Sequence, residues 1–293
     1  TTASNLDIAA PTGMKLMGIA LETLEFRNGD DLPLRVDLRH DPQQTSRGLV
    51  VVCHGFKGFR RWGFFPWVGE RLAKAGWTSA TFDFSCNGIG DDPLEFDRLD
   101  LFERTTYTRE MDDLDLVVAE LRERLDFGGS IGLLGHSRAA VDVVVRAAED
   151  PRIGAIVTWN GVGRALRFTD RQLEAWKRDG RLEFTNARTG QVMAMDYGFV
   201  RDVLDRGDRY DLALACARME AAHLIVHAAA DLAVPVSESI DLAAGREESA
   251  RFRRVEIEGS THTLGAVHPF DGATPALERA MGLTLAWFEE HLS

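Results

Sequence analysis

The stretch Ser130-Ile131-Gly132-Leu133-Leu134-Gly135-His136-Ser137-Arg138-Ala139-Ala140-Val141 predicts a strand, a sharp turn and a helix in immediate succession. The run from Ile131 to Leu134 is typical of a buried strand, and Gly135 permits a tight bend. Beyond the bend, valine and alanine residues continue at near-helical spacing as far as Asp150-Pro151. Ser137 is therefore expected at the apex, with its hydroxyl pushed out of the end of the sheet.

This arrangement is a candidate nucleophile elbow, because the helix that follows presents free backbone N–H groups to whatever the hydroxyl attacks. The pattern Gly135-x-Ser137-x-Ala139 departs from the usual G-x-S-x-G by one methyl group, which is a mild change. The pattern alone is weak evidence, and its other interpretation is a plain strand-to-helix turn capped by a serine.

The composition of the 293-residue chain fits one large domain or two small ones with a full hydrophobic core. Hydrophobic residues make up 45% of the chain and charged residues 27%. The formal net charge of −12 argues against nucleic acid and anionic membranes as partners, because both require concentrated Lys and Arg. An enzyme acting on small neutral molecules suits this balance better.

The cysteines and the apolar runs indicate the compartment. Cys53, Cys86 and Cys216 are an odd number without a C-x-x-C pair, which favours neither a disulfide framework nor a zinc site. No apolar run approaches the roughly 20 residues that span a bilayer, and no signal peptide is visible. We therefore expect a reducing, cytoplasmic location. The sequence begins without Met, which is consistent with an N-terminus that has been processed or engineered.

Strand and helix patterns alternate along the chain and predict a mostly parallel sheet wrapped on both sides. The first two strands are expected to form an antiparallel hairpin around the Asn28-Gly29 turn signal. The expected strands cover residues 15–26, 32–38, 47–53, 78–84, 131–134, 153–159, 224–228 and 252–257. The expected helices cover residues 64–75, 104–125, the segment after the elbow, 237–244 and 276–291.

One segment interrupts the alternation. Residues 164–220 have mixed character and predict a helix, a hairpin around Asn186 to Gly190, and one or two further helices. We expect this segment to be a lid inserted into a core of residues 1–163 and 221–293, because it carries apolar groups that need a surface to cover. An ordinary surface excursion is the alternative.

A serine nucleophile needs a histidine to accept its proton and an acid to orient that histidine. In a parallel sheet these partners are expected where later strands end, at the same edge as the elbow. Asp231 comes just after the strand at residues 224–228, and His262 follows the strand at residues 252–257. The order Ser137, Asp231, His262 is the chain order of α/β-hydrolases.

With these motifs the chain resembles the α/β-hydrolase-fold serine hydrolases from the first hairpin to the last helix. The matching segments are His54-Gly55-Phe56, Gly135 to Ala139, Asp231 with Val234-Pro235, and Ser260-Thr261-His262. The resemblance implies a mostly parallel eight-stranded sheet flanked by helices, with the insertion after the sixth strand. It implies Ser137 as nucleophile, His262 as general base and acid, and Asp231 as the residue that orients His262.

The resemblance also implies an oxyanion hole formed by the backbone N–H groups of Phe56 and Arg138. Aromatic residues crowd the segment from Phe56 to Trp67, and most are expected to pack the first helix. Among them, Phe56 and Trp62 are candidates for a substrate pocket wall. The other candidates for substrate binding are Trp159, Met193 and Met195.

Other histidines and acids lie close to these motifs in the sequence. His268 also follows the last strand and is the alternative base, whereas His54 and His136 are expected to hydrogen-bond the loops around the site. Asp83 is expected as a buried structural partner. The side chain of Arg138 is expected either to touch substrate or to form a surface ion pair.

Three functions follow from this site. The first is hydrolysis of a carboxylic ester through an acyl-enzyme, because the resemblance is nearest to lidded bacterial esterases of the feruloyl or cinnamoyl kind and to serine-peptidase-like hydrolases. The second is amide hydrolysis by an exopeptidase, which requires an acid such as Asp196 or Asp202 to face the pocket. The third is a non-catalytic binding protein, which the complete set of catalytic residues disfavours.

The expected partner is a small-molecule ester or amide with an apolar acyl or alcohol group. No metal or organic cofactor is expected, because neither a ligand cluster nor a phosphate-binding glycine loop appears. A homodimer is among the assemblies that remain open.

Overall fold

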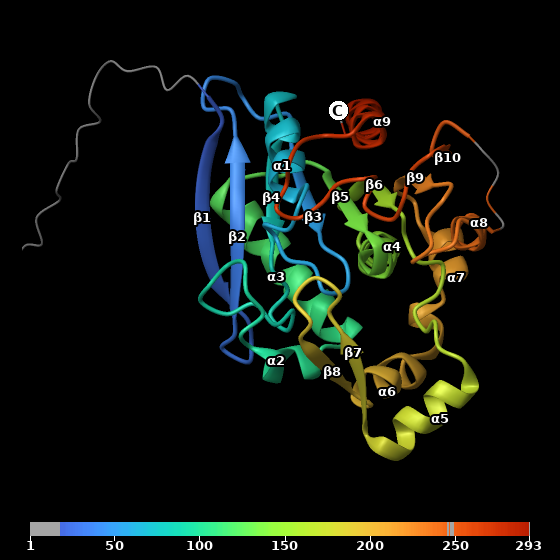
Figure 1. Ribbon diagram of the computed structural model, residues 1–293. Helices are drawn as coiled ribbons and strands as arrows, with labels where there is room; N and C mark the ends of the chain where they lie inside the picture. Colours follow the sequence, from blue (N-terminus) through green and yellow to red (C-terminus); the bar gives the residue numbers. More distant parts are fainter. Residues whose placement is uncertain (1–17, 245, 247–248, 293) are drawn as a thin grey trace, which may run out of the picture.

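A single eight-stranded sheet forms the centre of the computed structural model, which describes residues 18–244, 246 and 249–292. Its strand order is β1-β2-β4-β3-β5-β6-β9-β10 (Figure 1). The pairs β1·β2 and β2·β4 are antiparallel, and the other neighbours are parallel. The strands are β1 (Ala20–Arg27), β2 (Pro33–His40), β3 (Leu49–Cys53), β4 (Thr78–Phe82), β5 (Ile131–His136), β6 (Ile153–Trp159), β9 (Ala222–Ala228) and β10 (Phe252–Ile257). The expected fold class is confirmed.

The β1–β2 hairpin closes around Asn28, as the turn signal predicts. The side-chain Oδ1 of Asn28 accepts hydrogen bonds from the backbone N–H groups of Asp30 and Leu32, a local bond typical of Asx turns. Of the strand expected at residues 15–26, the first three residues lie outside the described part of the chain.

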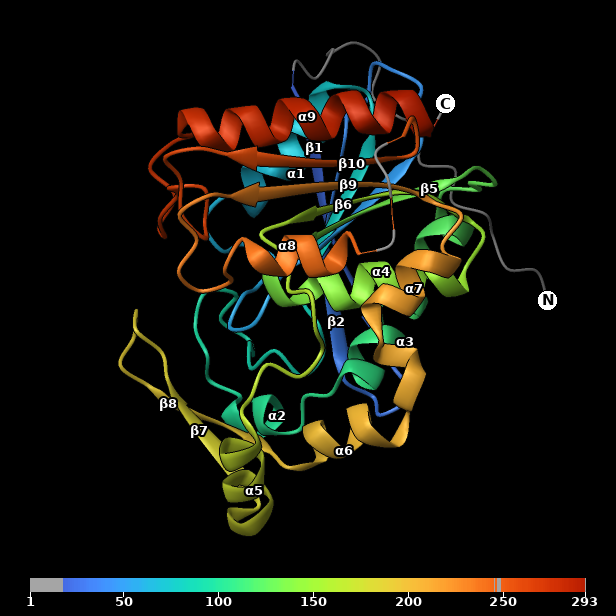
Figure 2. The same cartoon turned by 90° about the vertical axis from the view of Figure 1, so that its right-hand side faces the viewer.

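Helices cover both faces of the sheet (Figure 2). One face carries α1 (Phe65–Lys74) and α9 (Pro275–His291), and the other carries α3 (Tyr107–Arg124) and α4 (Ala140–Glu149), with α8 (Ser237–Leu242) on the same side. In β3, Val50 and Val52 pack into the core under α1 and α9, whereas Val51 packs into the opposite core. Because both faces are covered, β3 is an unbroken apolar run rather than an alternating one.

The helix α3 begins at Tyr107, three residues later than expected. Thr106 takes the N-cap position, and its side chain accepts a hydrogen bond from the backbone N–H of Arg109. Such a cap satisfies one of the free N–H groups at a helix start. A short helix that the sequence did not indicate, α2 (Leu99–Glu103), precedes it.

The insertion after β6 contains α5 (Asp170–Asp179), the hairpin of β7 (Arg181–Thr185) and β8 (Val192–Asp196), α6 (Gly198–Asp205) and α7 (Leu212–Arg218). The hairpin and α5 project from the sheet at the end that carries α2 (Figures 1 and 2). Trp176 is fully buried within the insertion and donates from Nε1 to the carbonyl of Met195 at 3.0 Å. Asp202 joins the insertion to the core, because its carboxylate accepts from the backbone N–H and the hydroxyl of Thr108.

No helix among the described residues has the length and apolar character needed to cross a membrane.

Candidate active site

Ser137 occupies a strained turn between β5 and α4. Its φ of +59° lies in the left-handed region, which non-glycine residues rarely adopt. Glycine is required two residues earlier, because a Cβ on Gly135 would lie 2.6 Å from the carbonyl oxygen of Ala139. Gly55 approaches the turn from the loop after β3, and a Cβ there would lie 2.8 Å from the Cβ of Ser137. Both glycines therefore permit close backbone packing around the serine.

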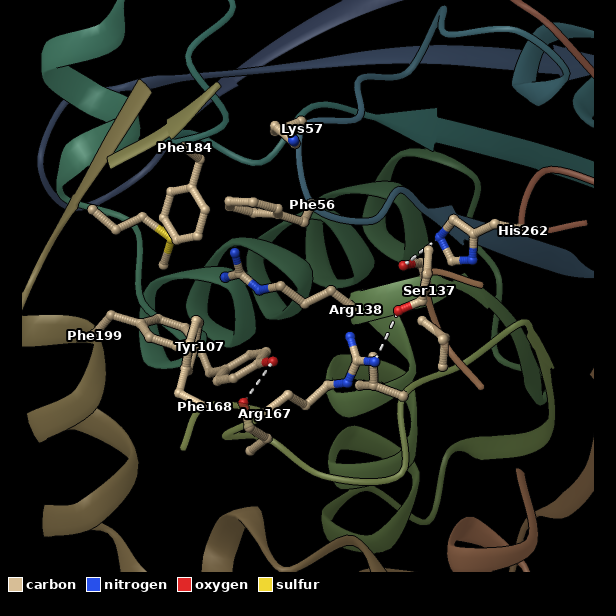
Figure 3. A pocket seen from close by; sticks show the side chains of 15 residues that line it. Phe56, Lys57, Tyr107, Ser137, Arg138, Arg167, Phe168, Phe184, Phe199 and His262 are labelled. Atoms are coloured by element: carbon tan, nitrogen blue, oxygen red, sulfur yellow. Dashed lines mark hydrogen bonds between the residues drawn. The ribbon is translucent and has the colours of Figure 1, made fainter. Parts of the chain in front are cut away.

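The structure brings Ser137, His262 and Asp231 into one hydrogen-bonded chain. The hydroxyl of Ser137 lies 2.9 Å from Nε2 of His262 (Figure 3). Nδ1 of the same ring lies 2.7 Å from Oδ2 of Asp231. Since an ionised carboxylate only accepts, Nδ1 carries the proton, and Nε2 is free to accept from the serine hydroxyl. This is the arrangement that a serine nucleophile requires.

Asp231 is held as a carboxylate. Its side chain is fully buried, and burial opposes ionisation. The bond from His262, and those to Oδ1 from the backbone N–H groups of Val234 and Ala233, outweigh burial and lower the pKa of Asp231. His227 lies nearby and is neutral, because burial lowers its pKa. The negative charge of Asp231 is therefore available to stabilise an imidazolium at His262.

The main chain of His262 is clamped by two side chains. Asn160 donates from Nδ2 to the His262 carbonyl at 2.6 Å, and His136 donates to the same oxygen from Nε2 at 3.0 Å. Burial lowers the pKa of His136 to about 3, so this ring is neutral. Asn160 also accepts the backbone N–H of Ala228, at the end of the strand that leads to Asp231. Asn160 was not singled out from the sequence, although its place after β6 is the same sheet edge.

A cavity of about 360 Å³ opens beside Ser137 and His262. Most of its wall is apolar and aromatic, and the insertion supplies a large share of it (Figure 3). The lining residues are Phe56, Lys57, Tyr107, Ser137, Arg138, Val162, Ala165, Arg167, Phe168, Phe184, Met195, Phe199, Ala233, Val234 and His262.

The Arg138 side chain runs from the elbow into this cavity and forms a buried ion pair rather than a surface one. Its guanidinium lies 2.6 Å from Glu110 and is stacked among the rings of Phe56, Tyr107 and Phe199. Burial works against the charge, but the attraction of Glu110 outweighs it and raises the pKa of Arg138.

Asp142, one helical turn beyond Arg138, is a buried acid beside this pair. Burial, and then repulsion by Glu110, raise its pKa well above the usual range. Its Oδ1 has no hydrogen-bond partner among the described residues.

Three of the residues expected in the pocket wall lie elsewhere. Trp159 is fully buried on the opposite side of the sheet, where its Nε1 donates to Thr284 of α9. Trp62 stacks on His268, away from the cavity. Met193 is fully buried in the hydrophobic core and is not among the residues that line the cavity. Of the five candidates for the pocket wall, Phe56 and Met195 are among the described residues that line the cavity.

The competing residues have structural partners. His268 accepts a hydrogen bond from the backbone N–H of Gly63 and does not approach Ser137. His54 bonds the loops after β3 and β4. Asp83 pairs with Arg60 in the interior. The three cysteines are buried, and burial raises the pKa of each thiol, so none is a ready nucleophile.

Among the described residues, no group of three or more His, Cys, Asp or Glu side chains is arranged to hold a metal ion.

The chain has the α/β-hydrolase fold. No protein-family model matches the sequence, and a search of curated proteins found no match. The esterase domain of a Rhodothermus marinus protein aligns over 94% of this chain and 100% of its own, with 16% identity and a TM-score of 0.65. Est1E from Butyrivibrio proteoclasticus, in a structure with ferulic acid bound, aligns over 91% and 99%, with 21% identity and a TM-score of 0.63. The α/β hydrolase GrgF from Penicillium sp. aligns over 93% and 99%, with 16% identity and a TM-score of 0.68.

Proposed function

We propose that this protein is a serine hydrolase that cleaves a carboxylic ester through an acyl-enzyme. The observation that carries the proposal is the continuous chain from the Ser137 hydroxyl through the His262 ring to the Asp231 carboxylate. The fold supports it, because esterases are among its structural neighbours.

In the first half of the reaction, Ser137 attacks the ester carbonyl while His262 takes its proton. The imidazolium then forms opposite ionised Asp231, and collapse of the tetrahedral intermediate passes that proton to the leaving alcohol. Water repeats the sequence on the acyl-enzyme and releases the acid, which returns Ser137 to its starting state.

The developing oxyanion needs two donors, for which we propose the backbone N–H groups of Phe56 and Arg138. Both residues line the cavity beside Ser137. The loop that carries Phe56 is close to the elbow, since a Cβ on Gly55 would lie 3.4 Å from the Arg138 nitrogen. One donor of this kind is worth about 2.7–4 kcal/mol of transition-state stabilisation.

We further propose that residues 164–220 act as a lid over this cavity. Arg167, Phe168, Phe184 and Phe199 reach the cavity from the insertion. A cover of this kind excludes water and strengthens the electrostatic interactions inside.

Amide hydrolysis by an exopeptidase is less well supported. Such an enzyme needs a fixed negative charge for the substrate amino terminus, and neither Asp196 nor Asp202 lines the cavity. Asp202 is bound to Thr108, and Asp196 caps the backbone N–H of Gly198.

A panel of p-nitrophenyl esters tests the proposed function, with Ser137→Ala as the matched control. Loss of the nucleophile is expected to lower turnover on the order of 10⁶-fold, and a fluorophosphonate probe should label the unaltered protein only. Equal ester hydrolysis by both proteins would contradict the proposal.

A further inference from the structure

Among the residues that the structure describes, the cavity wall carries three cations and no carboxylate. Lys57, Arg138 and Arg167 are among the lining residues, which include neither Asp nor Glu. The charge of these lining residues is therefore opposite in sign to that of the whole chain, whose formal net charge is −12. The positive character is therefore local to the candidate site.

Two of the three cations already have partners. Arg138 pairs with Glu110 at 2.6 Å. Arg167 pairs with Glu238 at 2.6 Å and also donates to the carbonyl of Ala233. Their charges are balanced by the protein, so neither requires a substrate anion.

Lys57 is the cation whose charge is left unbalanced. Among the described residues, no carboxylate lies within 4.0 Å of its Nζ, which bonds only the carbonyl of Thr185 at 3.5 Å. The side chain is half-buried, and desolvation lowers the pKa of Lys57. A partly desolvated ammonium without a counter-charge is costly, and an anionic ligand would remove that cost.

The position of Lys57 matches such a role. It follows Phe56 directly with a φ of +57°, and its ammonium lies 5.5 Å from the centroid of the Phe56 ring. Figure 3 shows it beside Phe56 and Phe184, at the aromatic end of the cavity and away from the Ser137 hydroxyl. When an ester is bound at Ser137, Lys57 therefore lies away from the carbonyl carbon that the serine attacks.

We propose that Lys57 is a specificity-determining residue that binds a carboxylate carried by the ester substrate. The inference rests on the proposed ester hydrolysis and replaces the expected neutral substrate with an anionic one. The carboxylate belongs either to the acyl group or to the alcohol group, and both positions present the same chemistry to the ammonium. If Lys57 only made a cation–π contact with Phe56, its substitution would not change how strongly charged and neutral substrates bind relative to each other.

Two pairs of esters distinguish these cases. Monomethyl adipate and dimethyl adipate differ by an acyl-side charge, and 4-acetoxybenzoate and its methyl ester differ by an alcohol-side charge. Dissociation constants are measured by ligand-observed NMR in a Ser137→Ala background, so that binding is read without turnover. The charged member of one pair is expected to bind about fivefold more tightly, which is the upper end of the range for a partly exposed ion pair.

Substitutions of Lys57 assign the preference. Lys57→Met should bring the charged-to-neutral ratio close to one, Lys57→Arg should retain it, and Lys57→Glu should invert it. Exposed Lys177 supplies the control for net charge, and Lys177→Met should leave the ratio unchanged. Thermal melting of each variant checks that it is folded.

Three outcomes are informative. A preference that depends on Lys57, and that weakens at high ionic strength, supports the inference. Equal binding of charged and neutral esters, or a preference that survives Lys57→Met, overturns it. Failure of the proposed function is seen separately, as absence of ester hydrolysis and of fluorophosphonate labelling in the protein with Ser137 intact.

Discussion

The side-chain amide of Asn160 donates a 2.6 Å hydrogen bond to the backbone carbonyl of His262. Because its Oδ1 also accepts from the backbone of Ala228, Asn160 connects the strand that leads to Asp231 with the loop that holds the proposed base. Its φ of +48° lies in the left-handed region, where asparagine is favoured over most residues. Asn160 is thus suited to be a positioning residue for His262.

Asn160→Asp is expected to lower kcat on the order of 10²-fold with a smaller effect on KM. The carboxylate cannot donate to the His262 carbonyl and repels it, and a displacement of about 1 Å at a catalytic group has an effect of this size. Steady-state kinetics across pH measure it, since a displaced imidazole also changes the pH profile of kcat.

A merely structural role for Asn160 would give a different result. In that case the melting temperature would fall while kcat per folded molecule and its pH profile stayed as in the unaltered protein. Aspartate suits the comparison because it tolerates the same backbone conformation.

Asp142→Asn is expected to stabilise the protein at neutral and alkaline pH. The pKa of Asp142 is raised by burial and then by Glu110, so the folded state binds its proton more tightly than the unfolded state does. Stability is therefore highest below the unfolded pKa and falls as pH rises toward the folded pKa. The asparagine removes this loss, and denaturant unfolding at several pH values measures the gain.

Asp112→Asn provides the control for Asp142. Asp112 is exposed on α3, so its substitution should change the free energy of unfolding by no more than about 0.5 kcal/mol. An equal effect of both substitutions would contradict the prediction.

Gly135→Ala is expected to destabilise the fold by about 1–3 kcal/mol and to reduce ester hydrolysis. The added Cβ would lie 2.6 Å from the Ala139 carbonyl oxygen and 2.8 Å from Val143, so that α4 must move. Gly282→Ala is the matched control, because this exposed glycine inside α9 has open space around the new methyl group. It should stabilise the protein by about 0.5–1 kcal/mol, as measured by denaturant unfolding.

Trp176→Phe is expected to loosen the insertion. The substitution removes the indole N–H that donates to the Met195 carbonyl and leaves a void where part of the fully buried indole lay, at a cost of about 1–3 kcal/mol. Limited proteolysis should then cut the chain faster within residues 164–220 than elsewhere. Uniform cleavage at an unchanged rate would show that Trp176 does not hold the insertion together.

Much of the architecture was predictable because it depends on short-range patterns. The apolar run at β3 and the strand, turn and helix around Ser137 carry their own periodicity, and the carboxyl ends of parallel strands meet at one edge. That rule predicts from the sequence that Asp231 and His262 lie near Ser137. The start of α3 and the existence of α2 were not predictable, because the cap at Thr106 and five-residue helices carry weak signals.

The wall of the cavity was decided by tertiary structure alone. Which face of the sheet a residue joins is set by strand register, and the register of β6 sends Trp159 toward α9 and away from the cavity. The ring contacts of Arg138 and the unbalanced charge of Lys57 depend on side chains that lie far apart in the sequence. The sequence by itself determined the fold class and the order of the three candidate catalytic residues, through local periodicity and strand ends. Only the tertiary structure decided what surrounds Ser137, because the cavity wall joins the insertion to core segments that lie far apart in the sequence.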